Sequence, residues 1–154
     1  MEVKTRAALY LDDLVPGQRY LSGSVRVETS EIHEFARRYD PQPFHLDEAA
    51  ARDSMFQGLA ASGWHTAALT MRLLVGSEFK PAGGLIGAGC DELRWPRPVR
   101  PGDELRVESE ILEVRASQSR PTQGIVKIRA TTLNQHGEPV QVFVGNLIVQ
   151  RRAS

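Results

Sequence analysis

A carboxylate and an imidazole stand close together in the segment Tyr39-Asp40-Pro41-Gln42-Pro43-Phe44-His45. Each proline fixes its own φ and disfavours the helical region for the residue before it. The sequence therefore predicts that Asp40 and His45 lie on a stiff, extended loop outside any helix. Two such groups at a fixed separation can hold a water between them and perform general acid–base chemistry. The spacing alone favours a plain turn into a helix capped by Asp47, so the chemical interpretation needs further support.

The elements around this segment follow from hydrophobic periodicity and turn residues. We expect a short helix capped by Thr29 or Ser30, a second one from Asp47 to Arg52, and a longer helix over 62–75. A strand over 20–28 precedes the helices, and long β-rich runs separated by short turns follow them, at 85–95, 103–115, 124–133 and 140–151. This order predicts an α+β architecture, with an antiparallel sheet and helices on one face.

Length and composition indicate one soluble domain. The 154 residues contain no repeat or linker, so we expect a single domain over 1–154 with a loosely held lead-in over 1–16. Nineteen basic residues balance nineteen acidic ones, which argues against nucleic acid or an anionic membrane as a partner. No run approaches the ~20 apolar residues that span a bilayer, and the stretch MEVKTRAALYLDDL lacks the apolar region of a secretory signal. The lone Cys90 fits a reducing cytoplasm, and no Cys/His cluster has the spacing of a metal site.

Three stretches of the chain resemble the MaoC-like dehydratases, the family that includes the R-specific enoyl-CoA hydratases. In order along the chain they are YDPQPFHLDEAAA, FQGLAASGWHTAAL and ELRWPRPVRPGDEL. The resemblance covers roughly residues 11–149 and implies the hot-dog fold, a curved antiparallel sheet around one long helix, here 62–75. It also implies a reversible hydration of a trans-2-enoyl-CoA thioester to an (R)-3-hydroxyacyl-CoA. Coenzyme A would belong to the substrate, and no further cofactor would be needed.

The same resemblance assigns roles to the proline-framed segment. Asp40 and His45 fall on the family's catalytic pair, with Asp40 as the base on water and His45 orienting that water and delivering a proton. Histidine suits this role because its ordinary pKa of about 6.5 lets it exchange a proton near neutrality. Gln42 stands where many members carry Asn, which leaves the shape of the substrate pocket open.

The start of the long helix, Ser62-Gly63-Trp64, is the second candidate site. Free N–H groups in a first helical turn stabilise negative charge on a thioester oxygen, and a glycine lets that oxygen approach the backbone. We therefore expect Gly63 to act as an oxyanion donor, with Ser62 and Trp64 beside the substrate. An ordinary Ser62 cap with a packed glycine is the alternative, and Ser62 replaces the His of many members.

Two other functions remain open alongside the hydratase. A hot-dog acyl-CoA thioesterase would use the same helix start, and a non-catalytic acyl-CoA-binding subunit would keep the fold without turnover. The run 140–149 is apolar on both faces, which predicts a homodimer or a higher homo-oligomer. Of the other histidines, we expect His65 on the helix surface or satisfied in the core, and His33 and His136 in solvent.

Overall fold

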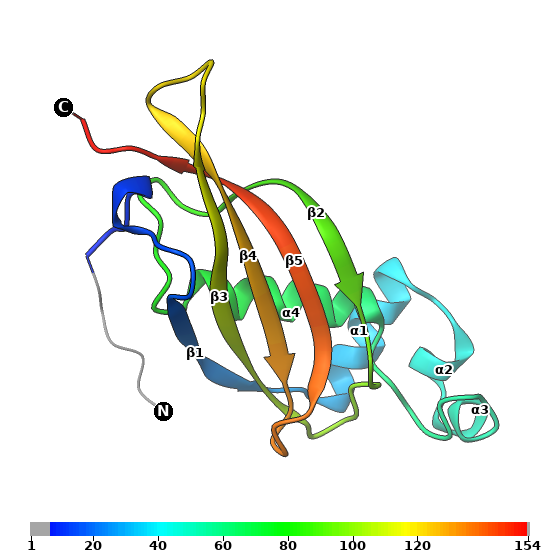
Figure 1. Cartoon of the computed structure of the whole chain (residues 1–154). Coiled ribbons are helices and arrows are strands. Elements are labelled where there is room, and N and C mark those ends of the chain that lie inside the picture. Colours follow the sequence, from blue (N-terminus) through cyan, green and yellow to red (C-terminus); the bar gives the residue numbers. More distant parts are fainter. Residues whose placement is uncertain (1–6, 154) are drawn as a thin grey trace.

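A five-stranded antiparallel sheet curves around one long helix in the computed structural model, which describes residues 7–153 (Figure 1). The sheet order is β1-β3-β4-β5-β2. Its strands are β1 (Arg19–Arg26), β2 (Ile86–Arg94), β3 (Glu104–Ala116), β4 (Gln123–Leu133) and β5 (Pro139–Gln150). The predicted α+β class and the hot-dog fold are confirmed.

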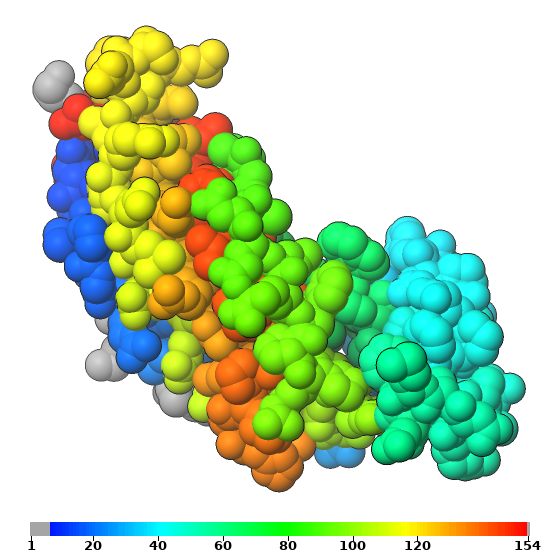
Figure 2. All heavy atoms as spheres, turned by 45° about the vertical axis from the view of Figure 1, so that its right-hand side comes forward, coloured from blue at the N-terminus to red at the C-terminus, as the bar shows by residue number. Residues whose placement is uncertain are grey.

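Four α-helices follow β1 and precede β2. They are α1 (Thr29–Tyr39), α2 (Pro43–Leu46), α3 (Glu48–Arg52) and α4 (Gly63–Val75). The central helix α4 crosses the concave face of the sheet and packs against β1 and β3. The three shorter helices form a helical lobe, residues 29–52, which projects from one end of the sheet (Figure 2).

The core lies between α4 and the concave face of the sheet. Leu69, Leu73 and Leu74 point inward from the helix and belong to one buried cluster with Ile111 and Ile128 of the sheet. Burying each such side chain contributes on the order of 2 kcal/mol, so this contact fixes the position of α4 under the strands. The start of α4 is thereby held at the end of the sheet that carries the helical lobe.

β5 is the strand that was expected to be apolar on both faces. It lies between β4 and β2. Val140, Val144 and Leu147 are buried, whereas Phe143 and Ile148 are half-buried. One face of the strand is thus covered within this chain, and the homodimer stays a prediction.

Two local expectations need correction, and a third is confirmed. Pro43 starts the one-turn helix α2 instead of excluding a helix. A residue at the first helical position makes no hydrogen bond within the helix through its N–H, so proline loses nothing there by lacking that group. Neither Thr29 nor Ser30 caps α1, whose N-cap is Glu28 without a side-chain bond. Asp47 caps α3 as expected, accepting hydrogen bonds from the amides of residues 49 and 50.

The lead-in over 1–16 was expected to be loosely held, and its described part is not. Leu11 and Leu14 are each only 5% exposed and belong to the core. The amide of Leu9 also donates to the Lys80 carbonyl at 2.8 Å. Residues 1–6 lie outside the described part of the chain.

Candidate functional site

The predicted acid–base pair is assembled by two consecutive helices. Asp40 ends α1 as its C-cap residue, and His45 lies in α2. His45 Nε2 is 3.2 Å from Asp40 Oδ2, and the two side chains are 5% and 16% exposed. The main-chain N–H of Gln42 closes a turn between them by donating to the main-chain carbonyl of Asp40 at 2.8 Å. The two groups therefore meet inside the protein, shielded from bulk water.

The second nitrogen of His45 determines how many protons the pair holds. His45 Nδ1 is 2.6 Å from the carbonyl oxygen of Ala60. Because a carbonyl oxygen only accepts, Nδ1 must carry a hydrogen there, and Nε2 of the neutral ring would then be an acceptor. A hydrogen bond from Nε2 to the Asp40 carboxylate needs one more proton, which the two side chains share. A pair of this kind can accept a proton at one group and release one from the other.

Two further side chains donate to the Asp40 carboxylate. Ser62 Oγ donates to Oδ2 at 2.7 Å, and Gln42 Nε2 donates to Oδ1 at 2.5 Å. Ser62 is fully buried and also accepts a hydrogen bond from the Trp64 amide at 3.2 Å, so it caps α4 as predicted. Its bond to Asp40 joins the start of α4 to the end of α1, which the local sequence pattern did not indicate.

These contacts set the charge of Asp40. Burial raises the pKa of its carboxyl group, but hydrogen bonds from Ser62 and Gln42 and the neighbouring His45 outweigh burial and leave that pKa below its ordinary value. Donors to a carboxylate favour its ionised form. Asp40 is therefore ionised at neutral pH and can act as a base.

A cavity of about 420 Å³ opens next to the pair. His45, Gln42 and Gly63 line its polar side, and its apolar wall comes from Phe44, Phe56, Trp95 and Val99. The volume lies within the usual range of small-molecule sites, about 300–1,000 Å³. The structure thus brings His45 of the predicted pair and Gly63 of the predicted helix start into one hollow, whereas Asp40, which lies 3.2 Å from His45, is not among the residues that line it.

Gly63 and Trp64 differ in how they meet this cavity. A Cβ atom on Gly63 would stand 2.7 Å from the Trp95 ring, so no larger residue fits beneath that ring as it lies. Trp64 is 59% exposed and touches Trp95 edge-on, with ring centroids 5.4 Å apart. Trp64 is not among the residues that line the cavity. Its expected place beside the substrate remains a prediction.

Arg100 supports the site without having been predicted. Its guanidinium donates to the carbonyls of Phe56, Gly58 and Leu59, the last two at 2.9 and 3.3 Å. These carbonyls belong to the irregular loop that follows α3 and leads to Ala60, the acceptor of His45. Arg100 lies within the PVRPGDEL run, but nothing in that run shows which distant loop it binds.

The other histidines lie elsewhere. His65 is 6% exposed and stacks on Phe35 with ring centroids 4.8 Å apart, so it is a core residue between α4 and α1. Burial lowers its pKa, and its Nδ1 has no hydrogen-bond partner within the described residues, which corrects the expectation of a satisfied ring. His33 is half-buried rather than solvated, and His136 is exposed as expected.

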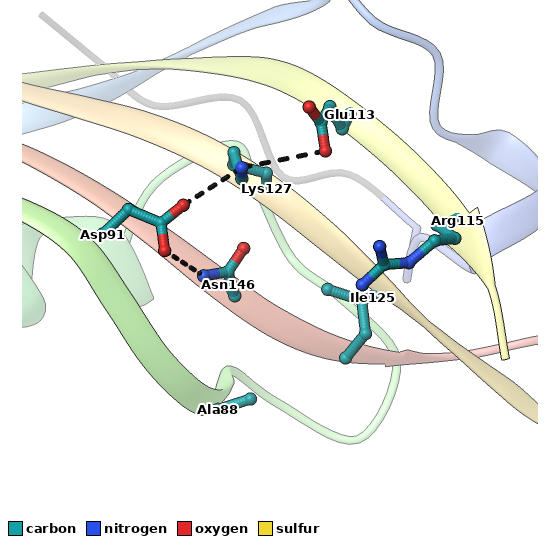
Figure 3. Close-up of a pocket in the computed structure, with 7 residues that line it drawn as sticks. All are labelled: Ala88, Asp91, Glu113, Arg115, Ile125, Lys127 and Asn146. Atoms are coloured by element: carbon teal, nitrogen blue, oxygen red, sulfur yellow. Dashed lines mark hydrogen bonds and ion pairs between the residues drawn. The ribbon is translucent and has the colours of Figure 1, made fainter.

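A second hollow, of about 360 Å³, lies on the outer face of the sheet (Figure 3). Lys127 Nζ lies there 3.0 Å from Asp91 Oδ2 and 3.8 Å from Glu113 Oε2. Asn146 Nδ2 donates to the other Asp91 oxygen at 3.1 Å. The charged groups in this hollow bind one another across β2, β4 and β3, and none of the predicted site residues is among them.

Comparison with known proteins places this geometry in a family. The family model of the MaoC like domain matches residues 13–134. The chain belongs to the MaoC-like domain family.

Individual relatives agree with this assignment. The crystal structure of a MaoC-like dehydratase from Rhodospirillum rubrum is 56% identical, with a TM-score of 0.92 over 96% of this chain and all of that one. The R-hydratase PhaJ1 from Pseudomonas aeruginosa is 27% identical, with a TM-score of 0.72 over 94% of this chain and 88% of the other. A mesaconyl-CoA hydratase from Cereibacter sphaeroides is 41% identical over 64 residues, which are 42% of this chain and 18% of that protein. These likenesses support a hydratase or dehydratase.

Two other kinds of site are absent from the described residues. No group of three or more His, Cys, Asp or Glu side chains there could hold a metal ion. No helix in residues 7–153 is both long and apolar enough to cross a membrane.

Proposed function

We propose that this protein hydrates a trans-2-enoyl-CoA thioester to an (R)-3-hydroxyacyl-CoA and also catalyses the reverse dehydration. The observation that carries the proposal is the buried Asp40–His45 pair, 3.2 Å apart, whose His45 lines the same cavity as Gly63 at the start of α4. The pair can exchange protons with a water, and the helix start offers free N–H groups to a thioester oxygen.

In the hydration direction, Asp40 accepts a proton from a water bound against the pair, whose two side chains already contact one another. The water oxygen bonds to C3 of the enoyl group, and the C2–C3 π electrons move onto the thioester oxygen to form an enolate. The Gly63 N–H donates to that oxygen and stabilises its charge. His45 Nε2 then gives its proton to C2, the enolate collapses to the thioester, and the proton on Asp40 returns to His45.

Coenzyme A and the R configuration are further parts of the proposal. The likeness to a mesaconyl-CoA hydratase supports a CoA thioester, and the likeness to an R-hydratase supports the R product. The chemistry as proposed needs no other cofactor, because the thioester makes the α-carbon acidic once its oxygen accepts a hydrogen bond. Asp40 and His45 supply and receive all of the protons.

Incubation with crotonyl-CoA tests the proposal against its rivals. Loss of the enoyl absorbance without release of free thiol is the expected result. Release of free thiol would instead show a thioesterase, which directs water at the carbonyl carbon. No reaction with crotonyl-CoA or longer enoyl-CoA thioesters would favour a non-catalytic acyl-CoA-binding subunit.

We also propose that the protein works as a homodimer. β2 ends the sheet, and its residues from Ile86 to Asp91 are exposed, which leaves a strand edge able to pair with a second copy. Trp64, Met71 and Val75 form an exposed apolar stripe along α4. An exposed edge next to apolar side chains is typical of an interface. Light scattering at micromolar concentration should give twice the mass of one chain, and a monomer would refute this part.

A further inference from the structure

We infer that Trp95 forms the end wall of the acyl cavity and that the protein therefore selects thioesters with short acyl chains. The inference rests on the function proposed above, because it concerns the acyl group of that substrate. It depends on one feature that the proposed function does not use, a chain of hydrogen bonds that runs from Trp95 into the core.

The first step is the position of the indole. The Trp95 ring lies against Gly63, so that a Cβ atom there would stand 2.7 to 2.9 Å from three of its carbons. Trp95 also lines the cavity. Since the thioester oxygen is proposed to bind at the Gly63 amide, the indole borders the acyl group within the first few carbons.

The second step is what holds the indole there. Trp95 Nε1 donates to Gln141 Oε1 at 2.8 Å, and Gln141 Nε2 donates to Thr70 Oγ1 at 3.1 Å. Thr70 Oγ1 donates to the Thr66 carbonyl at 2.9 Å, so its contact of 2.6 Å with Thr132 Oγ1 must be one in which Thr132 donates. We call Trp95, Gln141, Thr70 and Thr132 the polar ladder. Each donor atom named in this polar ladder therefore has an acceptor.

The third step is the burial of the three inner members of this polar ladder, since Trp95 itself is 40% exposed. Gln141 is 1% exposed, Thr70 4% and Thr132 fully buried. The polar ladder therefore fills the space between α4 and the sheet into which a longer acyl chain would have to grow beyond Thr66. An apolar chain there would separate Trp95 from Gln141 and leave the indole donor and the buried Gln141 acceptor unpaired. Each unpaired group costs enough to lower affinity by about tenfold or more.

The opposite side of the cavity offers no easier path. Phe44 and Phe56 pack there with ring centroids 5.1 Å apart, and both line the cavity. The loop that carries Phe56 is held by Arg100 through three carbonyls. A growing acyl chain thus meets aromatic rings in the cavity wall, and the polar ladder leads from Trp95 into the core.

The test begins with the wild-type protein and a series of crotonyl-, hexenoyl-, octenoyl- and decenoyl-CoA. We expect kcat/KM to be highest for crotonyl-CoA and to fall by about tenfold or more at octenoyl-CoA. An equal or higher kcat/KM for octenoyl-CoA would overturn the inference.

Two variants of the polar ladder then ask whether it causes the selectivity. Trp95→Ala should raise the ratio of octenoyl-CoA to crotonyl-CoA activity by about tenfold or more. Gln141→Leu should raise it less, because the indole remains but loses its anchor. Met55→Ala is the control, since that side chain is fully exposed and does not line the cavity. An unchanged ratio in both variants of the polar ladder would overturn the inference, and Gln141→Leu alone decides if Trp95→Ala does not fold.

A binding measurement separates this inference from the proposed function. Butyryl-CoA and octanoyl-CoA are saturated, so calorimetry reports their affinities whether or not the protein hydrates enoyl groups. Tighter binding of butyryl-CoA in the wild type, reversed in Trp95→Ala, would support the end wall even if no hydration were found. Tighter binding of octanoyl-CoA in the wild type would refute it even if hydration were confirmed.

Discussion

Two hollows of this molecule each border a pair of an acid and a base, and the two pairs differ in their burial and in the side chains around them. Asp40 and His45 are 3.2 Å apart with side chains 16% and 5% exposed. Asp91 and Lys127 are 3.0 Å apart with side chains 50% and 27% exposed. Similar separations therefore lie in different surroundings, one beside a cavity with an aromatic wall and the other among charged side chains on the outer face of the sheet.

The difference shows that proximity of opposite charges is not enough for chemistry. Hydrogen bonding to Asp91 raises the pKa of Lys127 further above its already high value, so its proton stays in place at neutral pH. The imidazole of His45 is the kind of group whose proton can move in that range. A helix start with free amides also lies beside the first pair, and no comparable group lines the outer hollow. The first pair is suited to catalysis and the second to holding strands together.

The largest expected effect comes from breaking the buried pair. Asp40→Asn and His45→Ala should each lower turnover about 10²- to 10⁴-fold, because general acid–base assistance contributes that much per group. Turnover with crotonyl-CoA and a thermal melt check the two variants. Near-normal hydration in both, with an unchanged melt, would show that the buried pair is not catalytic.

The next effect concerns the helix start. Gly63→Val should lower turnover about 10²- to 10³-fold if the Gly63 amide binds the thioester oxygen, because a branched side chain obstructs its approach. The clash with Trp95 confounds this variant, so it is also made in a Trp95→Ala background and compared with Trp95→Ala alone. A loss that persists in the relieved background supports the oxyanion role. Recovery there would mean that Gly63 only makes room for the indole.

Ser62→Ala sharpens the comparison by removing one donor to Asp40. If the hydrogen bond from Ser62 to the charged Asp40 acts in the reaction, its loss should lower turnover by about tenfold or more. The pKa of Asp40 should rise, because its ionised form loses a hydrogen bond. The acid limb of kcat/KM should then move to higher pH, which a simple helix cap would not change. Carbon NMR of the Asp40 carboxyl group in both proteins checks the direction.

The same substitution has a consequence for stability. Since the folded pKa of Asp40 lies below its unfolded value, its ionised form stabilises the fold above the unfolded pKa, and this contribution is lost as pH falls through the folded pKa. Ser62→Ala should reduce that contribution. Melting temperatures of the two proteins should therefore differ more at neutral pH than in acid, and a constant difference would contradict this account.

The smallest effect is expected at the outer hollow. Asp91→Asn and Lys127→Met should leave turnover with crotonyl-CoA unchanged and the melting temperature nearly so, because exposed ion pairs contribute little. A tenfold loss of turnover in either variant would show that the outer hollow takes part in the reaction. It would also remove the distinction drawn between the two regions.

The sequence predicted the parts of this molecule that depend on local pattern. The proline-framed segment drew attention to Asp40 and His45, whose catalytic roles came from the family resemblance and stay a prediction, and helical spacing predicted α4 to within a residue of its start. The sequence-based prediction was wrong for the single helical turn α2, because Pro43 begins a helix in the segment from which two prolines were expected to exclude one. Proline is well tolerated at the first position of a helix, but it disfavours the helical conformation for the residue before it. Short-range rules do not say which of these two effects decides the structure at Pro43.

The long-range contacts of the site could not be predicted in the same way. Ser62 reaches Asp40 across 22 positions, and Trp95 reaches Gln141 across 46. Both contacts depend on where the curved sheet places α4, and no local period encodes that placement. Ser62 had been singled out in the sequence as a departure from the family pattern, but nothing there predicted that Ser62 binds Asp40.

The way in which Arg100 holds its loop has a consequence for how this protein can evolve. The guanidinium binds main-chain carbonyls at residues 56, 58 and 59, and every amino acid has such a carbonyl. The support therefore does not depend on the side chain at Phe56, although position 58 needs its glycine, whose φ is +157° and whose added Cβ would stand 3.2 Å from the Arg100 guanidinium. Phe56, which lines the cavity, can be exchanged by mutation while the loop keeps its course and Ala60 stays in place for His45. This wall of the cavity is thus free to change between lineages while the Asp40–His45 pair keeps its shape.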